Sequence, residues 1–244
     1  MTTSRTNLAV LFAFTRSAVW WLICALTTIF YATLTILLVA FPIKTRFRIV
    51  TSWCHLNIWT LKWLCGVNYE VEGQENIPDS AAIVMSKHQS AWETIAFCFL
   101  FPPQVWVLKK SLLKLPFFGW GLASLNPIAI DRAAGSTAME QVVTQGRDRL
   151  DNGLWVVVFP EGTRVAYGQK KRYKLGGAVL AAETGYPVVP VAHNAGRLWP
   201  RNQFIKWPGK ITVSIGPVIE TGGLTAETIN RQVETWIETR MDSL

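Results

Sequence analysis

A histidine and a carboxylate lie close together in the stretch KHQSAWET, residues 87–94. An apolar run typical of a strand precedes His88, and Ser90 would open the next helix. Residues five apart on one helix are rotated by about 140°, so His88 must precede the helix if its ring is to meet Glu93. Glu93 would then accept one ring N–H and fix the tautomer, leaving the other nitrogen free to take a proton from a hydroxyl group. We therefore predict that His88 and Glu93 form a general-base pair.

A second interpretation of Glu93 is structural. Ser90-Ala91-Trp92-Glu93 also fits a capping box, in which Ser90 bonds the amide of the third helical residue and Glu93 bonds the amide of the cap. The spacing alone does not separate the two. His88 could likewise be an ordinary loop histidine, and His193, which ends a strand with no visible acidic partner, is predicted to have no catalytic role.

No nucleophile belonging to the protein accompanies this pair. The sequence contains no G-x-S-x-G elbow, and its four cysteines (Cys24, Cys54, Cys65 and Cys98) lie in apolar surroundings with no C-x-x-C spacing. They are typical of reduced packing residues, not of a metal site or a disulfide framework. The pattern favours direct attack by a substrate alcohol on an acyl carbonyl.

A second motif, FPEGTR at residues 159–164, follows the apolar strand run LWVVVF. It places Glu161, Gly162, Thr163 and Arg164 at a strand end, where sites of α/β proteins usually lie. Gly162 permits a tight backbone, and Arg164 can present a planar fork to a phosphate. The alternative is a plain type I turn with surface charges.

Further cations follow other strand runs. Lys109 and Lys110 come after QVWVL, Arg132 comes after NPIAID, and the tract KKRYK occupies residues 170–174. Single basic residues are usually solvated, but several at the ends of strands in one sheet could together hold a phosphomonoester.

An uncharged stretch of 27 residues, 17–43, precedes these motifs. As a helix it exceeds the roughly 30 Å hydrocarbon core of a bilayer, so we predict a membrane-embedded helix over about 17–41. A secretory signal is less favoured because the apolar run is too long and no cleavage site follows. Lys44, Arg46 and Arg48 after the stretch, against Arg5 and Arg16 before it, weakly favour a cytoplasmic catalytic domain.

Residues 46–64 are rich in tryptophan, and their apolar positions recur at helical spacing. Polar insertions fit an interfacial helix better than a second span; a buried soluble helix is the alternative. We therefore predict a membrane anchor over residues 1–65, followed by one domain over 66–244.

The overall composition agrees with a lipid surface as partner. The 244 residues carry a net charge of +8, half of them are hydrophobic and 12 are Trp, a residue that favours the membrane interface. Nucleic acid is the rival partner of a basic chain, but no zinc-finger spacing, recognition helix or basic tract with interleaved aromatics supports it.

Beyond Gly66, short β-prone runs alternate with helical stretches. This alternation predicts an α/β fold with a mixed, largely parallel sheet flanked by helices. The expected strands are 67–73, 81–88, 104–110, 127–131, 155–162, 186–192 and 210–216, and the expected helices are about 90–101, 136–151, 175–185 and 225–241.

Four ordered blocks over roughly residues 66–220 resemble the 1-acylglycerol-3-phosphate acyltransferase (lysophosphatidic acid acyltransferase) family of the glycerolipid acyltransferase superfamily. The blocks are KHQSAWE, then KKSLLKLPFFG leading to IAIDR, then FPEGTR, then VVPV at 188–191. The sequence departs from the family pattern at two positions. Glu93 stands where Asp is usual, and Ser111 replaces an acidic residue that commonly follows the paired lysines.

The resemblance implies roles for individual residues. It makes His88 the base that activates a glycerol hydroxyl and Glu93 its acidic partner. It assigns phosphate binding to Lys109 and Arg132. The third block's residues Glu161, Gly162, Thr163 and Arg164 become substrate contacts, and the block around Pro190 would shape the substrate pocket.

The implied activity is transfer of a fatty acyl group from acyl-CoA or acyl carrier protein to the sn-2 hydroxyl of lysophosphatidic acid, forming phosphatidic acid at a phospholipid membrane. No metal or organic cofactor is expected, because a thioester is already activated. The expected location is the inner (cytoplasmic) membrane, with the catalytic domain on the cytoplasmic side. Two alternatives stay open: an acyltransferase for another lysolipid, and a non-catalytic membrane-binding protein.

Overall fold

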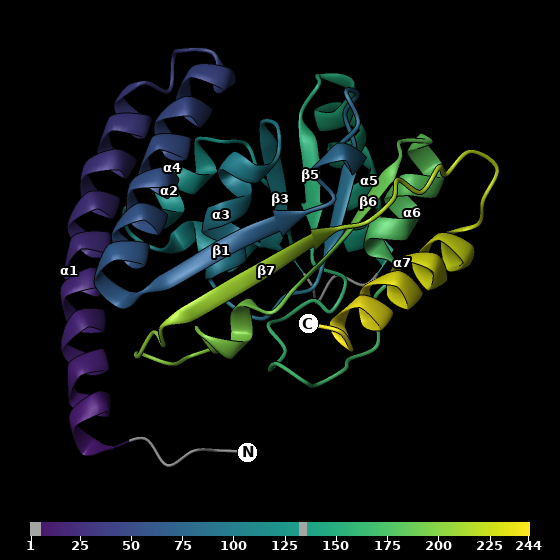
Figure 1. Ribbon diagram of the computed structural model, residues 1–244. Helices are drawn as coiled ribbons and strands as arrows, with labels where there is room; N and C mark the ends of the chain where they lie inside the picture. The colour runs from purple at the N-terminus through teal and green to yellow at the C-terminus, as the bar shows by residue number, and fades with distance from the viewer. Residues whose placement is uncertain (1–5, 132–135) are drawn as a thin grey trace.

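The computed structural model describes residues 6–131 and 136–244 and shows one seven-stranded sheet with helices on both faces (Figure 1). The strands are β1 (Val67–Glu72), β2 (Ile83–Ser86), β3 (Gln104–Lys109), β4 (Ile128–Ile130), β5 (Trp155–Val158), β6 (Val188–His193) and β7 (Gly209–Ile215). The α-helices are α1 (Asn7–Leu37), α2 (Ile43–Cys65), α3 (Trp92–Leu100), α4 (Phe118–Ala123), α5 (Ser136–Asp151), α6 (Gly176–Thr184) and α7 (Ala226–Met241). Short 3₁₀ turns are η1 (Gln74–Asn76), η2 (Lys110–Lys114) and η3 (Ala195–Arg197).

The strands lie in the order β1-β7-β6-β2-β5-β3-β4. Strands β2 to β6 run parallel to one another, β7 pairs antiparallel with β6, and β1 pairs parallel with β7. The prediction of a mixed, largely parallel α/β sheet is confirmed. Because β2, β5 and β6 are adjacent and parallel, their carboxyl ends meet at one edge, where the candidate motifs follow them.

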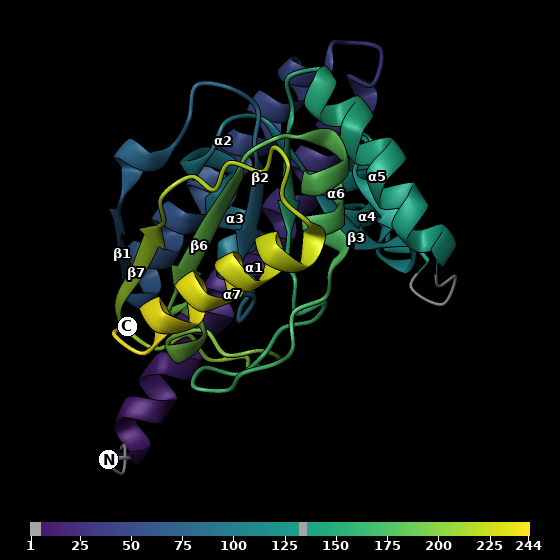
Figure 2. The same cartoon turned by 90° about the vertical axis from the view of Figure 1, so that its right-hand side faces the viewer.

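Two apolar layers cover the sheet. The central strands are buried on both faces, which explains why their sequences are almost continuously apolar. On one face, side chains of α1, α2 and α3 pack against the sheet, and on the other face α5, α6 and α7 do so. Figure 2 shows the second layer in front, with α7 crossing over the sheet.

Helix α1 begins earlier than predicted, at Asn7, after the cap Thr6 whose hydroxyl accepts the amide of Ala9. The sequence-based start at residue 17 assumed that Arg16 lies outside the helix. In the structure its Nε donates to the carbonyl of Leu64 at the end of α2. The charge is therefore accommodated on the helix. Helix α3 begins at Trp92, two residues later than predicted.

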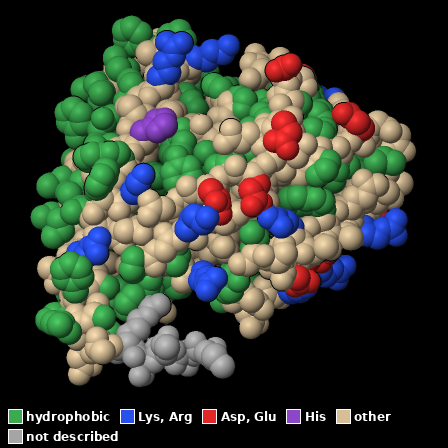
Figure 3. Space-filling model, viewed as in Figure 1, with side chains coloured by type: hydrophobic (Ala, Val, Ile, Leu, Met, Phe, Trp, Pro, Cys, Tyr) green, Lys and Arg blue, Asp and Glu red, His purple; other side chains and the backbone are tan. Residues whose placement is uncertain are grey.

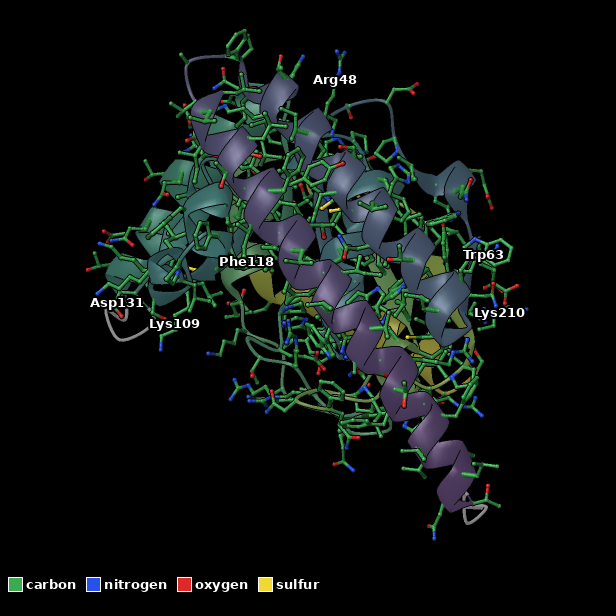
Figure 4. The ribbon with its side chains drawn as sticks, turned by 90° about the vertical axis from the view of Figure 1, so that its left-hand side faces the viewer. Arg48, Trp63, Lys109, Phe118, Asp131 and Lys210 are labelled. Carbon is green, nitrogen blue, oxygen red and sulfur yellow. The ribbon has the colours of Figure 1, made fainter. Side chains whose placement is uncertain are left out.

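Helix α1 is the one described helix long and apolar enough to cross a membrane. Many of its large apolar side chains are exposed, and they form the apolar left edge of the surface in Figure 3. Figure 4 shows α1 lying diagonally across α2 and outermost on this side. The division into an anchor over 1–65 and a domain over 66–244 stays a prediction.

The inner face of α1 nevertheless belongs to the main core. Trp20 is fully buried, donates its indole N–H to the Asn57 carbonyl at 3.0 Å and packs edge-on against Trp199, with ring centroids 5.0 Å apart. Helix α4 approaches α1 closely, because a Cβ on Gly121 would lie 3.1 Å from the Cβ of Ala32. These contacts tie α1 to α2, to α4 and to the segment that follows η3.

This packing predicts a large effect for Trp20→Ala. Truncating a fully buried tryptophan in a packed core typically costs about 3–5 kcal/mol of unfolding free energy. We expect a correspondingly lower melting temperature in detergent micelles. Leu22→Ala, two residues along the same helix and 61% exposed, is the matched control and should melt like the parent. Equal melts for the two variants would contradict a structural role for α1.

Candidate active site

His88 lies just beyond the carboxyl end of β2, in the loop before α3. Its Nδ1 is 2.8 Å from Glu93 Oε1, so Nδ1–H donates to the carboxylate and Nε2 is the basic nitrogen. The imidazole stacks on the ring of Phe159, with centroids 3.9 Å apart and planes inclined by 13°. Within residues 6–131 and 136–244, no protein group hydrogen-bonds His88 Nε2, and the side chain is 14% exposed. His88 therefore has a fixed tautomer and a ring nitrogen without a partner among the described residues.

Glu93 also binds the backbone at the start of α3. Its Oε1 accepts the amides of Gln89 at 2.9 Å and Ser90 at 2.8 Å, while Ser90 Oγ accepts the amide of Trp92 at 3.1 Å. Half of the expected capping box is present, because Glu93 reaches back to Ser90, whereas Ser90 bonds Trp92 and not Glu93. The Glu93 carboxylate thus makes both of the contacts that the spacing left open, one with the His88 ring and one with the amide before the helix.

The surroundings keep Glu93 ionised. Burial raises the pKa of the Glu93 carboxyl, the hydrogen bonds from His88 and from the Ser90 amide lower it, and the pKa lies below its usual range. Glu93 is fully buried. A permanent negative charge 2.8 Å from the imidazole is suited to stabilise an imidazolium as His88 takes a proton.

His193 is a second buried histidine beside the pair, at the end of β6. Its Nε2 lies 2.9 Å from the Lys87 carbonyl and its Nδ1 accepts the Ala195 amide at 3.3 Å. Burial lowers the pKa of His193, which favours this neutral, hydrogen-bonded form. No role was predicted for His193, because its partner is the backbone carbonyl of Lys87, just after β2, and no sequence spacing reveals such a contact.

The loop FPEGTR lies directly beside His88, as expected from the adjacency of β2 and β5. The Val165 amide donates to the His88 carbonyl at 2.7 Å, and Glu161 Oε2 accepts the His88 amide at 2.8 Å. Glu161 is fully buried, and its other oxygen lies 2.7 Å from Lys87 Nζ. The two oxygens of the Glu161 carboxylate therefore contact the His88 amide and the Lys87 ammonium, and they hold the loop that carries His88 in place.

Gly162 lets this loop turn sharply. Its φ of 68° lies in the left-handed region, its amide closes the turn onto the Phe159 carbonyl at 2.9 Å, and a Cβ there would lie 3.2 Å from Lys174 Nζ. Thr163 follows on the half-buried part of the loop. A turn is therefore present at this loop, but its charged residues are not surface charges, because Glu161 is fully buried and Arg164 is half-buried.

Arg164 is half-buried next to this turn. Burial lowers the pKa of its guanidinium, the negative Glu93 opposes that effect and Arg201 adds to it. Among the described residues, no carboxylate forms an ion pair with Arg164. A partly desolvated arginine without an acidic partner is suited to an anionic ligand.

Lys109, another predicted phosphate ligand, lies farther along the same edge. Lys109 ends β3, beyond β5, and is paired in register with Ile130. Figure 4 shows Lys109 near Asp131. It belongs to no hydrogen bond or ion pair of the His88 cluster. Arg132 lies outside the described residues. In the described part of the chain, no three His, Cys, Asp or Glu side chains are grouped as metal ligands.

The chain is similar to known proteins over most of its length. A sequence model of the family described as Acyltransferase matches residues 68–194. A 1-acyl-sn-glycerol-3-phosphate acyltransferase of Pseudomonas aeruginosa is 41% identical over 231 residues, 93% of this chain and 90% of the relative. The chain belongs to the 1-acylglycerol-3-phosphate acyltransferase family. A coconut (Cocos nucifera) enzyme of the same name is 29% identical over 93% of this chain and 74% of its own length.

The fold is shared with a solved member of this family. The crystal structure of the 1-acyl-sn-glycerophosphate acyltransferase from Thermotoga maritima has a TM-score of 0.79, with 94% of each chain covered and 24% identity. The family resemblance seen in the four sequence blocks is confirmed. The matched range 68–194 contains His88, Glu93 and the FPEGTR loop of this family member.

The two functions of Glu93 can be separated by substitution. Gln keeps an amide oxygen that can accept the Gln89 and Ser90 amides, so Glu93→Gln should melt only slightly below the parent. It lacks the charge that stabilises an imidazolium, so turnover should fall by at least about 10²-fold. Glu93→Asp, the residue usual in the family, should retain part of the activity. Thermal melts and initial rates test this, and full activity of Glu93→Gln would leave Glu93 with capping alone.

Proposed function

We propose that this protein transfers a fatty acyl group from a thioester donor to the sn-2 hydroxyl of 1-acylglycerol-3-phosphate, which produces phosphatidic acid. The observation that carries the proposal is the His88–Glu93 pair with Nε2 directed away from Glu93, in a site that also holds an arginine without an acidic partner. The names of the relatives support the choice of acceptor.

The proposed reaction needs only one proton carrier. Nε2 of His88 takes the proton of the acceptor hydroxyl as its oxygen attacks the thioester carbonyl carbon. The resulting tetrahedral intermediate collapses with cleavage of the carbon–sulfur bond, and the imidazolium returns its proton to the leaving thiolate. The products are an ester and a free thiol. Glu93 stays ionised and offsets the transient charge on His88.

The acceptor phosphate is assigned to the cations at this edge of the sheet. Arg164 lies on the loop that bonds the His88 backbone, so a phosphate on its guanidinium places the acceptor near the base. Lys109 and Arg132 are proposed as further phosphate ligands on the family resemblance. Thr163 and the backbone at Gly162 are proposed as additional acceptor contacts. Glu161 acts on the substrate indirectly, through His88.

The acceptor and product are lipids, and α1 offers the corresponding surface. Its exposed apolar side chains and its length support a phospholipid membrane as the partner of this face. The proposed location is the inner membrane with the catalytic domain on the cytoplasmic side, where acyl-CoA and acyl carrier protein are both available as donors. Assays that cross lysolipids of several headgroups with both donors test acceptor and donor together.

His88→Ala tests the proposed base. Loss of a positioned general base should reduce turnover by at least about 10²-fold. Loss of the contacts of the ring with Phe159 and Glu93 should lower the melting temperature, and a cooperative thermal melt shows that the variant is folded. His55→Ala removes an exposed histidine of α2 and should retain full activity. Near-normal turnover of folded His88→Ala would remove His88 from the mechanism.

Arg164→Lys tests the proposed phosphate contact. The ammonium retains the charge but not the planar fork, so KM for lysophosphatidic acid should rise by about 10-fold, the value of one lost charge-assisted hydrogen bond. The measurement varies the acceptor at saturating donor. Arg231→Lys, an exposed arginine on α7, is the control. An unchanged acceptor KM would assign Arg164 to structure.

A further inference from the structure

Lys87, immediately before His88, is buried in contact with two carboxylates. Its Nζ lies 2.7 Å from Glu161 Oε1 and 2.7 Å from Glu238 Oε1, and its side chain is 2% exposed. Glu238 comes from the C-terminal helix α7, 151 residues away in sequence. The Tyr173 hydroxyl donates to the same Glu238 oxygen at 2.9 Å. A buried lysine thus joins the site to a helix outside the matched family range 68–194.

The contacts form a continuous path to the proposed base. Glu238 holds Lys87, Lys87 holds Glu161, and Glu161 accepts the backbone amide of His88. The backbone of Lys87 is fixed too, because its amide donates to the Val191 carbonyl at 3.0 Å and its carbonyl faces His193. If the Lys87 ammonium moved, the displacement would therefore reach His88 by two routes, through the Glu161 carboxylate and through the backbone of Lys87.

The charges explain why both carboxylates are needed. A buried ammonium requires several hydrogen bonds, and the third contact of Lys87 Nζ, the Gln169 carbonyl, is long at 3.5 Å. Without Glu238, Lys87 would have one close acceptor for three donors. Removing one charged partner of a buried ammonium lowers the stability of the fold. The Lys87 ammonium is therefore expected to move toward the acceptors that remain.

We propose that Glu238 is a positioning residue for the acyl-transfer site, which acts through Lys87 and Glu161 to hold His88 in register with the FPEGTR loop. Helix α7 is then part of the catalytic architecture, not only a cover for one face of the sheet. Figure 2 shows α7 lying across that face. The proposal rests on the proposed role of His88 as base, and the experiment below separates the two.

The central variant is Glu238→Ala. An atom misplaced by about 1 Å can cost 10²-fold in rate, so kcat per folded molecule should fall by roughly 10-fold or more. KM for lysophosphatidic acid should stay within about twofold, because no ion pair among the described residues joins Arg164 to Lys87 or Glu238. Glu238→Gln retains one acceptor oxygen and should restore part of kcat. Asp242→Asn, which removes an exposed carboxylate from the end of the same helix, is the matched control and should behave like the parent.

A second readout reports the histidine without turnover. The chain has only three histidines, so the protein labelled with ¹³C,¹⁵N-histidine should give few imidazole signals, assigned with His88→Ala. We expect the His88 signals to shift in Glu238→Ala and to stay in place in Asp242→Asn. Tyr173→Phe removes only the hydroxyl bond to Glu238 and should give a smaller change of the same kind. It carries the test if Glu238→Ala does not fold.

The outcomes distinguish the two ideas. A fall in kcat together with shifted His88 signals supports the positioning role. Unshifted His88 signals overturn the positioning role, whether or not kcat falls. A lower melting temperature with unchanged kcat and unchanged His88 signals overturns it as well. Shifted signals with unchanged kcat would support the positioning of His88 and reject His88 as the base.

Discussion

The buried carboxylate of Glu93 is the interaction on which the site depends. It collects the ring N–H of His88 and the backbone amides of Gln89 and Ser90 within 2.8 to 2.9 Å of one oxygen. A buried carboxylate without hydrogen-bond donors would be unfavourable in free energy. Glu93 therefore requires the chain to turn before α3, and this turn brings the donors to it. The same geometry that begins α3 also orients the imidazole. The start of α3 and the orientation of the His88 ring therefore both depend on one carboxylate, and the Glu side chain reaches both sets of donors.

The second loop is built to fit the first. Bonds between Val165 and His88 and between Glu161 and His88 hold FPEGTR against the histidine, and the Lys174 amide closes the same loop onto Pro160 at 2.8 Å. Two short strands that are neighbours in a parallel sheet suffice for this arrangement, because their carboxyl ends emerge side by side. The position of Arg164 relative to the base follows from backbone contacts, not from a contact between the two side chains.

The sequence predicted the sheet and the location of the site for identifiable reasons. Fully buried parallel strands require continuous apolar runs, and polar motifs directly after such runs lie at one edge. The start of α1 was missed because Arg16 finds its partner, the Leu64 carbonyl, only in the tertiary structure. The buried direction of Glu161 and the contact between Lys87 and Glu238 depend on side chains from separate parts of the chain. Local spacing carries no information about either.

The contacts of α1 extend to the proposed base itself. Trp20 packs on Trp199, which follows η3, and the Gly196 amide in η3 donates to Gln89 Oε1 at 3.1 Å, next to His88. A Cβ on Gly196 would lie 2.8 Å from the Cβ of Gln89, so this approach tolerates little displacement. With α1 in lipid as proposed, this path of packed groups sets the depth of His88 relative to the bilayer. An acceptor whose acyl chain stays in the membrane then presents its hydroxyl at a fixed height above the bilayer. A base that is held from both faces of the sheet can stay at the same height.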